Sequence, residues 1–269
     1  KYGFQLPARI LITQALDTKT ATAVRLGALK SLVKRKNSSV ESVAKSLVND
    51  SQIEMRQLAL TALLQVNEKA AIDSALMILK TASVKDKQNT YKLIAKRHDS
   101  RIEAFLIKEL EKIIKGANQT TTALDVIEAA KLRQESAIKA KLAEYEKSIP
   151  VGNAMAKFAP ALNGGDIAKG KEIFLNHSGG QCLRCHKVND FGADVGPDLS
   201  SLGKERDRSY ILESVIDPGA KVAPGFGIIS MTLKNGTAVS GIFQKETDSE
   251  IHVKAADGKV TKYSKKEIA

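Results

Sequence analysis

The chain has 269 residues, 43% of them hydrophobic, which suffices for two domains or for an elongated array with an added module. No stretch approaches the length of a membrane span, so the composition predicts a soluble chain, and residues 1–7 do not form a signal peptide. Most of the net charge of +12 lies in residues 1–150, with 26 Lys and Arg against 16 Asp and Glu, but a chain with 4% aromatic residues and no Trp favours an acidic protein partner over nucleic acid.

Residues 8–148 read as amphipathic helices separated by short polar turns, and the pattern repeats. Residues 24–32 and 55–63 share Arg, Ala, Leu and Leu at positions 31 residues apart, and another step of 31 reaches residues 87–94. A weaker copy begins at Ala123. Second helices are expected between the copies, at Val40 to Val48, Ala70 to Leu79, Arg101 to Ile114 and Ala137 to Tyr145. This period predicts an α-solenoid of two-helix units; an ordinary helical bundle is the alternative.

The shared pattern x-Arg-x-x-Ala-Leu-x-x-Leu resembles HEAT-like repeats. The resemblance implies that the Ala positions allow close helix packing and that the Arg lies at the surface between repeats. Residues 1–150 are therefore expected to form a HEAT-like scaffold that offers a docking surface. His98 stands alone in its segment, so we predict no catalytic group in this half.

A change of composition marks the end of the helical half. Pro150 and Gly152 interrupt the helical pattern, and residues 151–165 read as a linker that ends at Asp166, a helix N-cap. Asp166 then begins a helix that runs to about Leu175. We expect a second domain over residues 166–231.

Cys182-Leu183-Arg184-Cys185-His186 contains both cysteines of the chain and is the attachment signature of a c-type haem. Two thiols about one helical turn apart can add to the two vinyl groups of one porphyrin, and the adjacent imidazole becomes an axial ligand of the iron. The sequence therefore predicts one covalent haem c on Cys182 and Cys185, with His186 as its proximal ligand.

The two cysteines have three other possible interpretations: a redox pair, a zinc site and a disulfide. A thioredoxin-like pair needs an apolar strand before the first Cys, where this chain has a polar, Gly-rich loop. A structural zinc site needs two more ligands, and only a cramped set with His177 and His186 is at hand. A disulfide between Cys182 and Cys185 would close too small a loop to stabilise a fold.

Gly170 and Phe174, one turn apart before the cysteines, resemble the first helix of class I cytochromes c. Val195-Gly196-Pro197-Asp198-Leu199 resembles the Gly-Pro-x-Leu segment of that family. The resemblance implies that the Pro197 carbonyl accepts the proton of the His186 ring, that Leu199 covers the porphyrin, and that Tyr210, on a helix over Asp207 to Ile216, packs where that helix crosses Gly170.

The second axial ligand of the iron has several candidates. Met231 is preferred, because the Pro- and Gly-rich run from Ala223 to Met231 resembles the distal loop of class I cytochromes. Met231 also fits an alternating, strand-like run, in which it would be an ordinary apolar residue. Met155, His177 and His252 are the other candidates, and an open sixth position stays possible.

Residues 227–269 alternate with period two. Strands are expected over residues 228–233, 238–243, 250–254 and 259–263, with turns at Asn235-Gly236 and Asp257-Gly258. The fold class expected for the whole chain is mainly α and multidomain: a HEAT-like solenoid, a class I cytochrome c-like helical domain and a small C-terminal antiparallel sheet or barrel.

This order of helical repeats, attachment motif, Gly-Pro segment and strands resembles the haem-binding domains joined to large membrane-associated dehydrogenases of planctomycetes and verrucomicrobia. The resemblance implies an electron-transfer module, not itself an enzyme. Its electron donor would be a dehydrogenase domain or protein, and its acceptor would follow downstream. Covalent haem attachment in bacteria predicts a periplasmic or otherwise extracytoplasmic location. A haem-based sensor or small-ligand binder is the alternative; a peroxidase would need a distal acid–base pair that the sequence does not offer.

Overall fold

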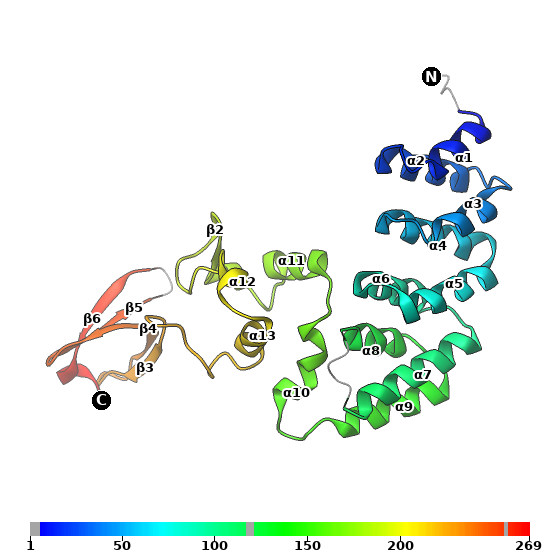
Figure 1. The fold of residues 1–269 in the computed structure, drawn as a ribbon. Helices are drawn as coiled ribbons and strands as arrows, with labels where there is room; N and C mark the ends of the chain where they lie inside the picture. Colours follow the sequence, from blue (N-terminus) through cyan, green and yellow to red (C-terminus); the bar gives the residue numbers. More distant parts are fainter. Residues whose placement is uncertain (1–5, 117–120, 256–257) are drawn as a thin grey trace. The chain divides into compact units, whose positions relative to one another are not determined.

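The computed structural model describes residues 6–116, 121–255 and 258–269. The chain divides into two compact units, Lys1–Pro150 and Val151–Ala269 (Figure 1). It is mainly helical and carries one small antiparallel sheet of four strands, which confirms the expected secondary-structure class. Within the described ranges, no helix is both long and apolar enough to cross a membrane.

The described part of the first unit consists mainly of helices. They are α1 (Ala8–Leu16), α2 (Thr22–Lys34), α3 (Val40–Leu47), α4 (Ile53–Val66), α5 (Glu68–Thr81), α6 (Val84–Ile94), α7 (Ser100–Ile114), α8 (Ala123–Lys131) and α9 (Ser136–Ser148). Asn67, Ser83 and Asp99 cap α5, α6 and α7, because each side chain accepts a backbone N–H from the first turn. Three of the polar turns that separate the helices in the sequence therefore also supply N-terminal caps.

The 31-residue repeat corresponds to the core of this unit. The positions that share the repeat are buried in each of its first three copies: Ala28, Leu29 and Leu32; Ala59, Leu60 and Leu63; and Thr90, Tyr91 and Ile94. They lie on α2, α4 and α6, and α2 packs on α4, α4 on α6 and α6 on α8. Successive helices thus bury the same apolar stripe against the next member of the row (Figure 1).

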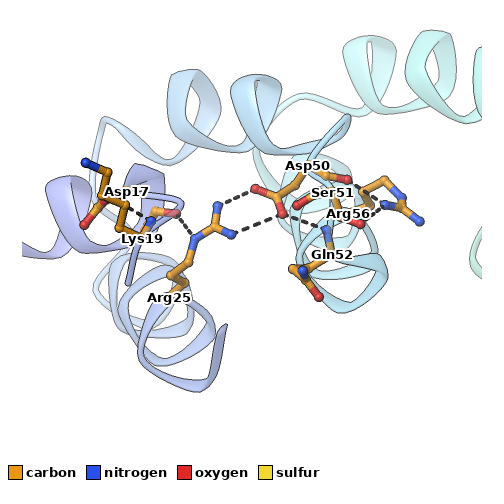
Figure 2. Close-up of polar contacts among 8 residues, drawn as sticks. Asp17, Lys19, Arg25, Asp50, Ser51, Gln52 and Arg56 are labelled. Atoms are coloured by element: carbon orange, nitrogen blue, oxygen red, sulfur yellow. Dashed lines mark hydrogen bonds and ion pairs between the residues drawn. The ribbon is translucent and has the colours of Figure 1, made fainter. Parts of the chain in front are cut away.

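Two arginines at the repeat spacing bind carboxylates between successive helices, and Figure 2 shows the first of these pairs, Arg25 with Asp50. Arg25 of α2 pairs with Asp50, and its Nε donates to the Ala15 carbonyl at 3.1 Å. Arg56 of α4 pairs with Asp86 through Nε (2.9 Å) and Nη2 (2.8 Å).

The two ion pairs are linked by the turn before α4. Arg56 Nη1 donates to the carbonyls of Asp50 and Ser51 at 2.6 and 2.9 Å (Figure 2). The Arg25 and Asp50 side chains are almost fully buried, at 2% and 5% exposure. Each arginine therefore satisfies backbone acceptors as well as a buried charge, as buried ion pairs require.

The second unit consists of short helices and strands, the first of which is a helix that begins at Ala154. Its elements are α10 (Ala154–Phe158), η1 (Ala159–Leu162), α11 (Ile167–Asn176), η2 (Cys182–Arg184), β1 (Lys187–Val188), β2 (Phe191–Gly192), α12 (Leu202–Glu205), α13 (Arg208–Ile216), β3 (Ile228–Thr232), β4 (Ala238–Glu246), β5 (Glu250–Lys254), β6 (Val260–Ser264) and η3 (Lys265–Glu267). Residues 151–165, expected as a linker, contain α10 and η1. The Asn153 side chain caps α10 by accepting the Ala156 N–H at 2.9 Å.

The four-stranded sheet has the order β3-β4-β5-β6, and all its strands are antiparallel neighbours. Gly236 and Gly258, at the expected turns, have φ of +84° and +83°, a region that favours Gly. Asp257, the other residue of the second expected turn, lies outside the described residues.

The expected close crossing at Gly170 is wrong. A Cβ built on Gly170 of α11 would meet no atom within 4 Å outside its immediate helical surroundings, so no other helix approaches closely there. Instead, α13 packs against α10 and η1. Its Tyr210 ring lies 5.0 Å from the Arg206 guanidinium and 5.9 Å from Lys221 Nζ, so two cations occupy its neighbourhood.

We predict that Arg25→Ala lowers the free energy of unfolding by about 3–5 kcal/mol, because it leaves the buried Asp50 carboxylate without its cation. Urea unfolding followed by helical circular dichroism measures this loss. Lys30→Ala, which removes an exposed cation of the same helix, should change the value by less than about 0.5 kcal/mol. Equal effects of the two substitutions would contradict a structural role for the buried pair.

The same pair should make the first unit sensitive to acid. Burial raises the Asp50 pKa, but hydrogen bonds from Arg25 and from the Gln52 N–H, with the charges of Arg25 and Arg56, bring it below its ordinary 3.8. The unfolded chain then binds this proton at higher pH than the folded chain, so the stabilisation present above pH 3.8 is lost as the pH falls.

We therefore expect urea midpoints to fall less steeply for Asp50→Asn than for the wild type between about pH 5 and pH 3. Lys30→Ala should keep the wild-type pH dependence. Parallel curves for Asp50→Asn and the wild type would show that this carboxylate does not contribute.

Candidate functional site

The five-residue motif is held by a tight turn built on one carbonyl. After α11, Gln181 adopts left-handed backbone geometry (φ +43°) and Cys182 begins η2. The Cys182 carbonyl accepts the N–H of Cys185 at 3.2 Å and that of His186 at 2.9 Å. The turn therefore brings both cysteines and His186 into one short segment.

Both thiols are free, and both are accessible to a ligand. Cys182 is half-buried and Cys185 is exposed. The structure contains no disulfide between them. Thiols in this state have the chemistry that addition to a carbon–carbon double bond requires.

The imidazole of His186 is oriented by the loop that follows it. His186 Nδ1 lies 2.9 Å from the Pro197 carbonyl oxygen, and the ring is half-buried. A carbonyl oxygen can only accept a hydrogen bond, so this contact places a proton on Nδ1, and in the neutral ring Nε2 then keeps its lone pair. His186 is thus prepared to bind a metal through Nε2, as ligating histidines do when the other nitrogen donates to a backbone carbonyl.

Gly196 provides the space in which the imidazole lies. A Cβ at this position would stand 2.8 Å from Cε1 and 2.9 Å from Nδ1 of His186, closer than side chains pack. The Gly196 N–H also donates to the Cys185 carbonyl, which joins the loop to the motif. The absence of a side chain at 196 is therefore a requirement of the ring position.

Gly192 is subject to a similar steric constraint, here from the backbone of His186. It has φ +107°, and a Cβ there would lie 2.1 Å from the His186 carbonyl oxygen. No sequence pattern predicted a role for Gly192, and Gly196 was identified only as part of the Gly-Pro segment. An isolated Gly after Phe191 was the only available signal for Gly192, and it does not reveal a tertiary contact.

Backbone hydrogen bonds fix the loop that carries Pro197 and Leu199. The strands β1 and β2 form a two-residue hairpin, and the Leu199 N–H donates to the Lys187 carbonyl at 2.9 Å. Lys254 Nζ of β5 donates to the Asp194 carbonyl at 3.0 Å. Leu199 and Pro197 are both half-buried, and the sheet supports the same loop through Lys254.

The stretch of sequence that contains the motif holds no buried side chain. From residue 161 to residue 241 every residue is half-buried or exposed, whereas the apolar core lies in the first unit. Large apolar side chains are exposed in this stretch: Ile167, Ile173, Leu175, Phe191, Val215, Val222 and Ile228. A polypeptide segment with this exposure has unused apolar surface that an apolar prosthetic group would cover.

The candidates for the distal ligand lie in different elements. Met231 is half-buried in β3, where it pairs in register with Val239 of β4, so it has the surroundings of an ordinary strand residue. His177 Nδ1 accepts the Gly180 N–H at 2.9 Å. His252 Nε2, in β5, lies 3.2 Å from Glu250 Oε2, and Met155 lies in α10.

The structure therefore brings together five of the residues singled out in the sequence. Cys182, Cys185 and His186 share one turn, and the loop with Pro197 and Leu199 is hydrogen-bonded to it. Met231 belongs to a separate strand. In the part of the chain that the structure describes, no group of three or more His, Cys, Asp or Glu side chains is placed to hold a metal ion.

Comparison with known proteins adds no family assignment. No protein-family model matches the chain, and no curated protein matches it.

We predict that Gly196→Ala displaces the His186 ring and weakens its hydrogen bond to Pro197, because the new methyl would overlap the imidazole. Imidazole ¹⁵N chemical shifts at a pH where the ring is neutral report which nitrogen holds the proton. The wild type should show the Nδ1-protonated form, and Gly196→Ala should lose this preference.

Gly203→Ala is the matched control, because a Cβ at 203 would meet no atom within 4 Å. It should leave the His186 shifts unchanged. Retention of the Nδ1-protonated form in Gly196→Ala would contradict the steric argument.

Proposed function

We propose that the chain is a c-type cytochrome electron-transfer module with one covalent haem. The observation that carries the proposal is the donor set: two free thiols in one turn with an imidazole whose Nδ1 is held by Pro197 and whose Nε2 is free to bind iron. Cys182 and Cys185 would form the thioether bonds, His186 would be the proximal ligand, and Leu199 would cover part of the porphyrin.

When bound, a c-type haem supplies a one-electron iron couple, whose potential depends on its axial ligands. The chain's own contribution is to hold the imidazole and exclude water. Pro197 keeps the proton on Nδ1, and Gly196 permits the ring position. The exposed apolar side chains of α11 and β2, the elements in contact with the cysteine turn, would help to shield the site from water.

Met231 is the distal ligand in this proposal. A thioether ligand opposite an imidazole raises the potential, which suits acceptance of electrons from a dehydrogenase. We further propose that the donor is a dehydrogenase domain or protein, that a downstream acceptor takes the electron, and that the chain works outside the cytoplasm. These parts of the proposal rest on the family resemblance of the sequence.

The first unit would be a HEAT-like α-solenoid that serves as a scaffold. Support comes from the packing of α2, α4, α6 and α8 in a row. Arg25 and Arg56 add to it, because they lie 31 residues apart and bind the carboxylates of Asp50, just before α4, and Asp86 of α6. Such an array buries its core between neighbours and leaves long surfaces for partners.

The experiment that tests haem attachment is co-production of the chain with a bacterial cytochrome c maturation system. We expect a haem-stained band that survives a denaturing gel, because thioether bonds are covalent. Cys182→Ser with Cys185→Ser should abolish the band, while Ser178→Ala in the same loop should retain it. A wild-type band that is absent, or a band that persists in the double variant, would refute the proposal.

The optical spectrum distinguishes electron transfer from ligand sensing. The ferric wild type should be low-spin with a methionine–iron charge-transfer band, and the ferrous form should not bind carbon monoxide readily. Met231→Ala should lose the band, and Met155→Ala should keep it. A band that persists in Met231→Ala excludes Met231 as the ligand; ready binding of carbon monoxide by the wild type favours the sensor function instead.

A further inference from the structure

A groove of about 800 Å³ lies among α5, α6 and α7 of the first unit, away from the cysteine motif in the sequence. Leu76, Leu79, Tyr91 and Phe105 contribute to its lining. The rings of Tyr91 and Phe105 lie 6.5 Å apart, centroid to centroid. Leu76 and Phe105 are only half-buried, so the floor of the groove offers accessible apolar surface.

Three lysines surround this floor without a carboxylate partner. Lys80, Lys87 and Lys108 all line the groove, one from each helix. Across the described ranges, no ion pair joins any of the three to Asp or Glu, and Lys87 Nζ reaches only the Lys80 carbonyl, at 3.4 Å. Three positive charges beside an apolar surface thus lack an internal counter-charge.

The other cations of the groove are already paired. Arg101 binds Asp99 at 2.9 Å, and Lys112 binds Glu109 at 2.5 Å. This contrast separates the three lysines from an ordinary solvated face, where opposite charges alternate. The unpaired positive charge of the groove thus comes from all three of its helices.

We propose that this groove binds an acidic peptide segment of a protein partner, with an apolar side chain on Leu76 and Phe105 and carboxylates at Lys80, Lys87 and Lys108. Charge complementarity selects the partner and accelerates its encounter, and the apolar contact adds affinity. The inference concerns the first unit and does not depend on haem in the second.

A peptide fits these features better than a nucleic acid. Nucleotide recognition uses aromatic faces on which bases stack, and here Tyr91 is buried at 2% exposure. Phe105 alone is partly accessible, and it lies next to aliphatic surface from Leu76. A peptide with one apolar side chain between carboxylates matches this combination.

The probe is a fluorescein-labelled peptide, Glu-Asp-Glu-Phe-Glu-Asp-Glu, and the measurement is fluorescence anisotropy with the full chain. We expect saturable binding that weakens as salt is raised, and weaker binding when each carboxylate is replaced by its amide. Lys80→Glu with Lys87→Glu and Lys108→Glu should lower the affinity about tenfold or more, because like charges would then face each other.

The matched control is Lys19→Glu with Lys30→Glu and Lys34→Glu, which makes the same change of net charge at exposed positions outside the groove. Its affinity should stay within about twofold of the wild type, since distant exposed charges are screened. The corresponding Gln substitutions at 80, 87 and 108 should also weaken binding, and they replace the groove variant if that one does not fold.

Three results would overturn the proposal. In the first, the wild type does not bind the peptide. In the second, the groove and control variants lose equal affinity, which means that net charge alone attracts the probe. In the third, labelled oligothymidylate would bind more tightly than the peptide and would lose the same affinity in the groove variant, which assigns the groove to nucleic acid.

Discussion

The hydrogen bond between His186 Nδ1 and the Pro197 carbonyl is the constraint on which the candidate site depends. It links the cysteine motif to the loop that follows, and it favours the neutral form of the ring in which Nδ1 carries the proton. The bond is possible because Gly196 leaves room for the ring and because Gly192 passes the His186 carbonyl without a side chain. Side-chain chemistry at one residue is thus controlled by backbone geometry at three others.

The two units obtain their order in different ways. The first unit buries a continuous apolar core and adds ion pairs such as Arg25 with Asp50 between successive helices. In the second, order around the motif comes from turns, caps and backbone hydrogen bonds, while apolar side chains such as Phe191 remain exposed. This difference is physically consistent with a scaffold in one unit and, in the other, a segment whose apolar surface suits a prosthetic group.

Sequence alone predicted what depends on local spacing. The 31-residue repeat identified the buried positions of α2, α4 and α6, and alternation identified the four strands. It did not predict α10 and η1, because the short run after Pro150 has too few residues to show a period. It wrongly expected a helix crossing at Gly170, since a spacing of Gly and Phe174 does not determine which helix packs there. The steric role of Gly192 was invisible because it is a tertiary contact.

A haem attached to both Cys182 and Cys185 would bridge a trypsin site, because Arg184 lies between the two cysteines. We would digest the matured protein with trypsin and measure peptide masses. We expect residues 172–184 and 185–187 to stay together as one species whose mass equals both peptides plus one haem. Recovery of the two peptides as separate species without haem would contradict it.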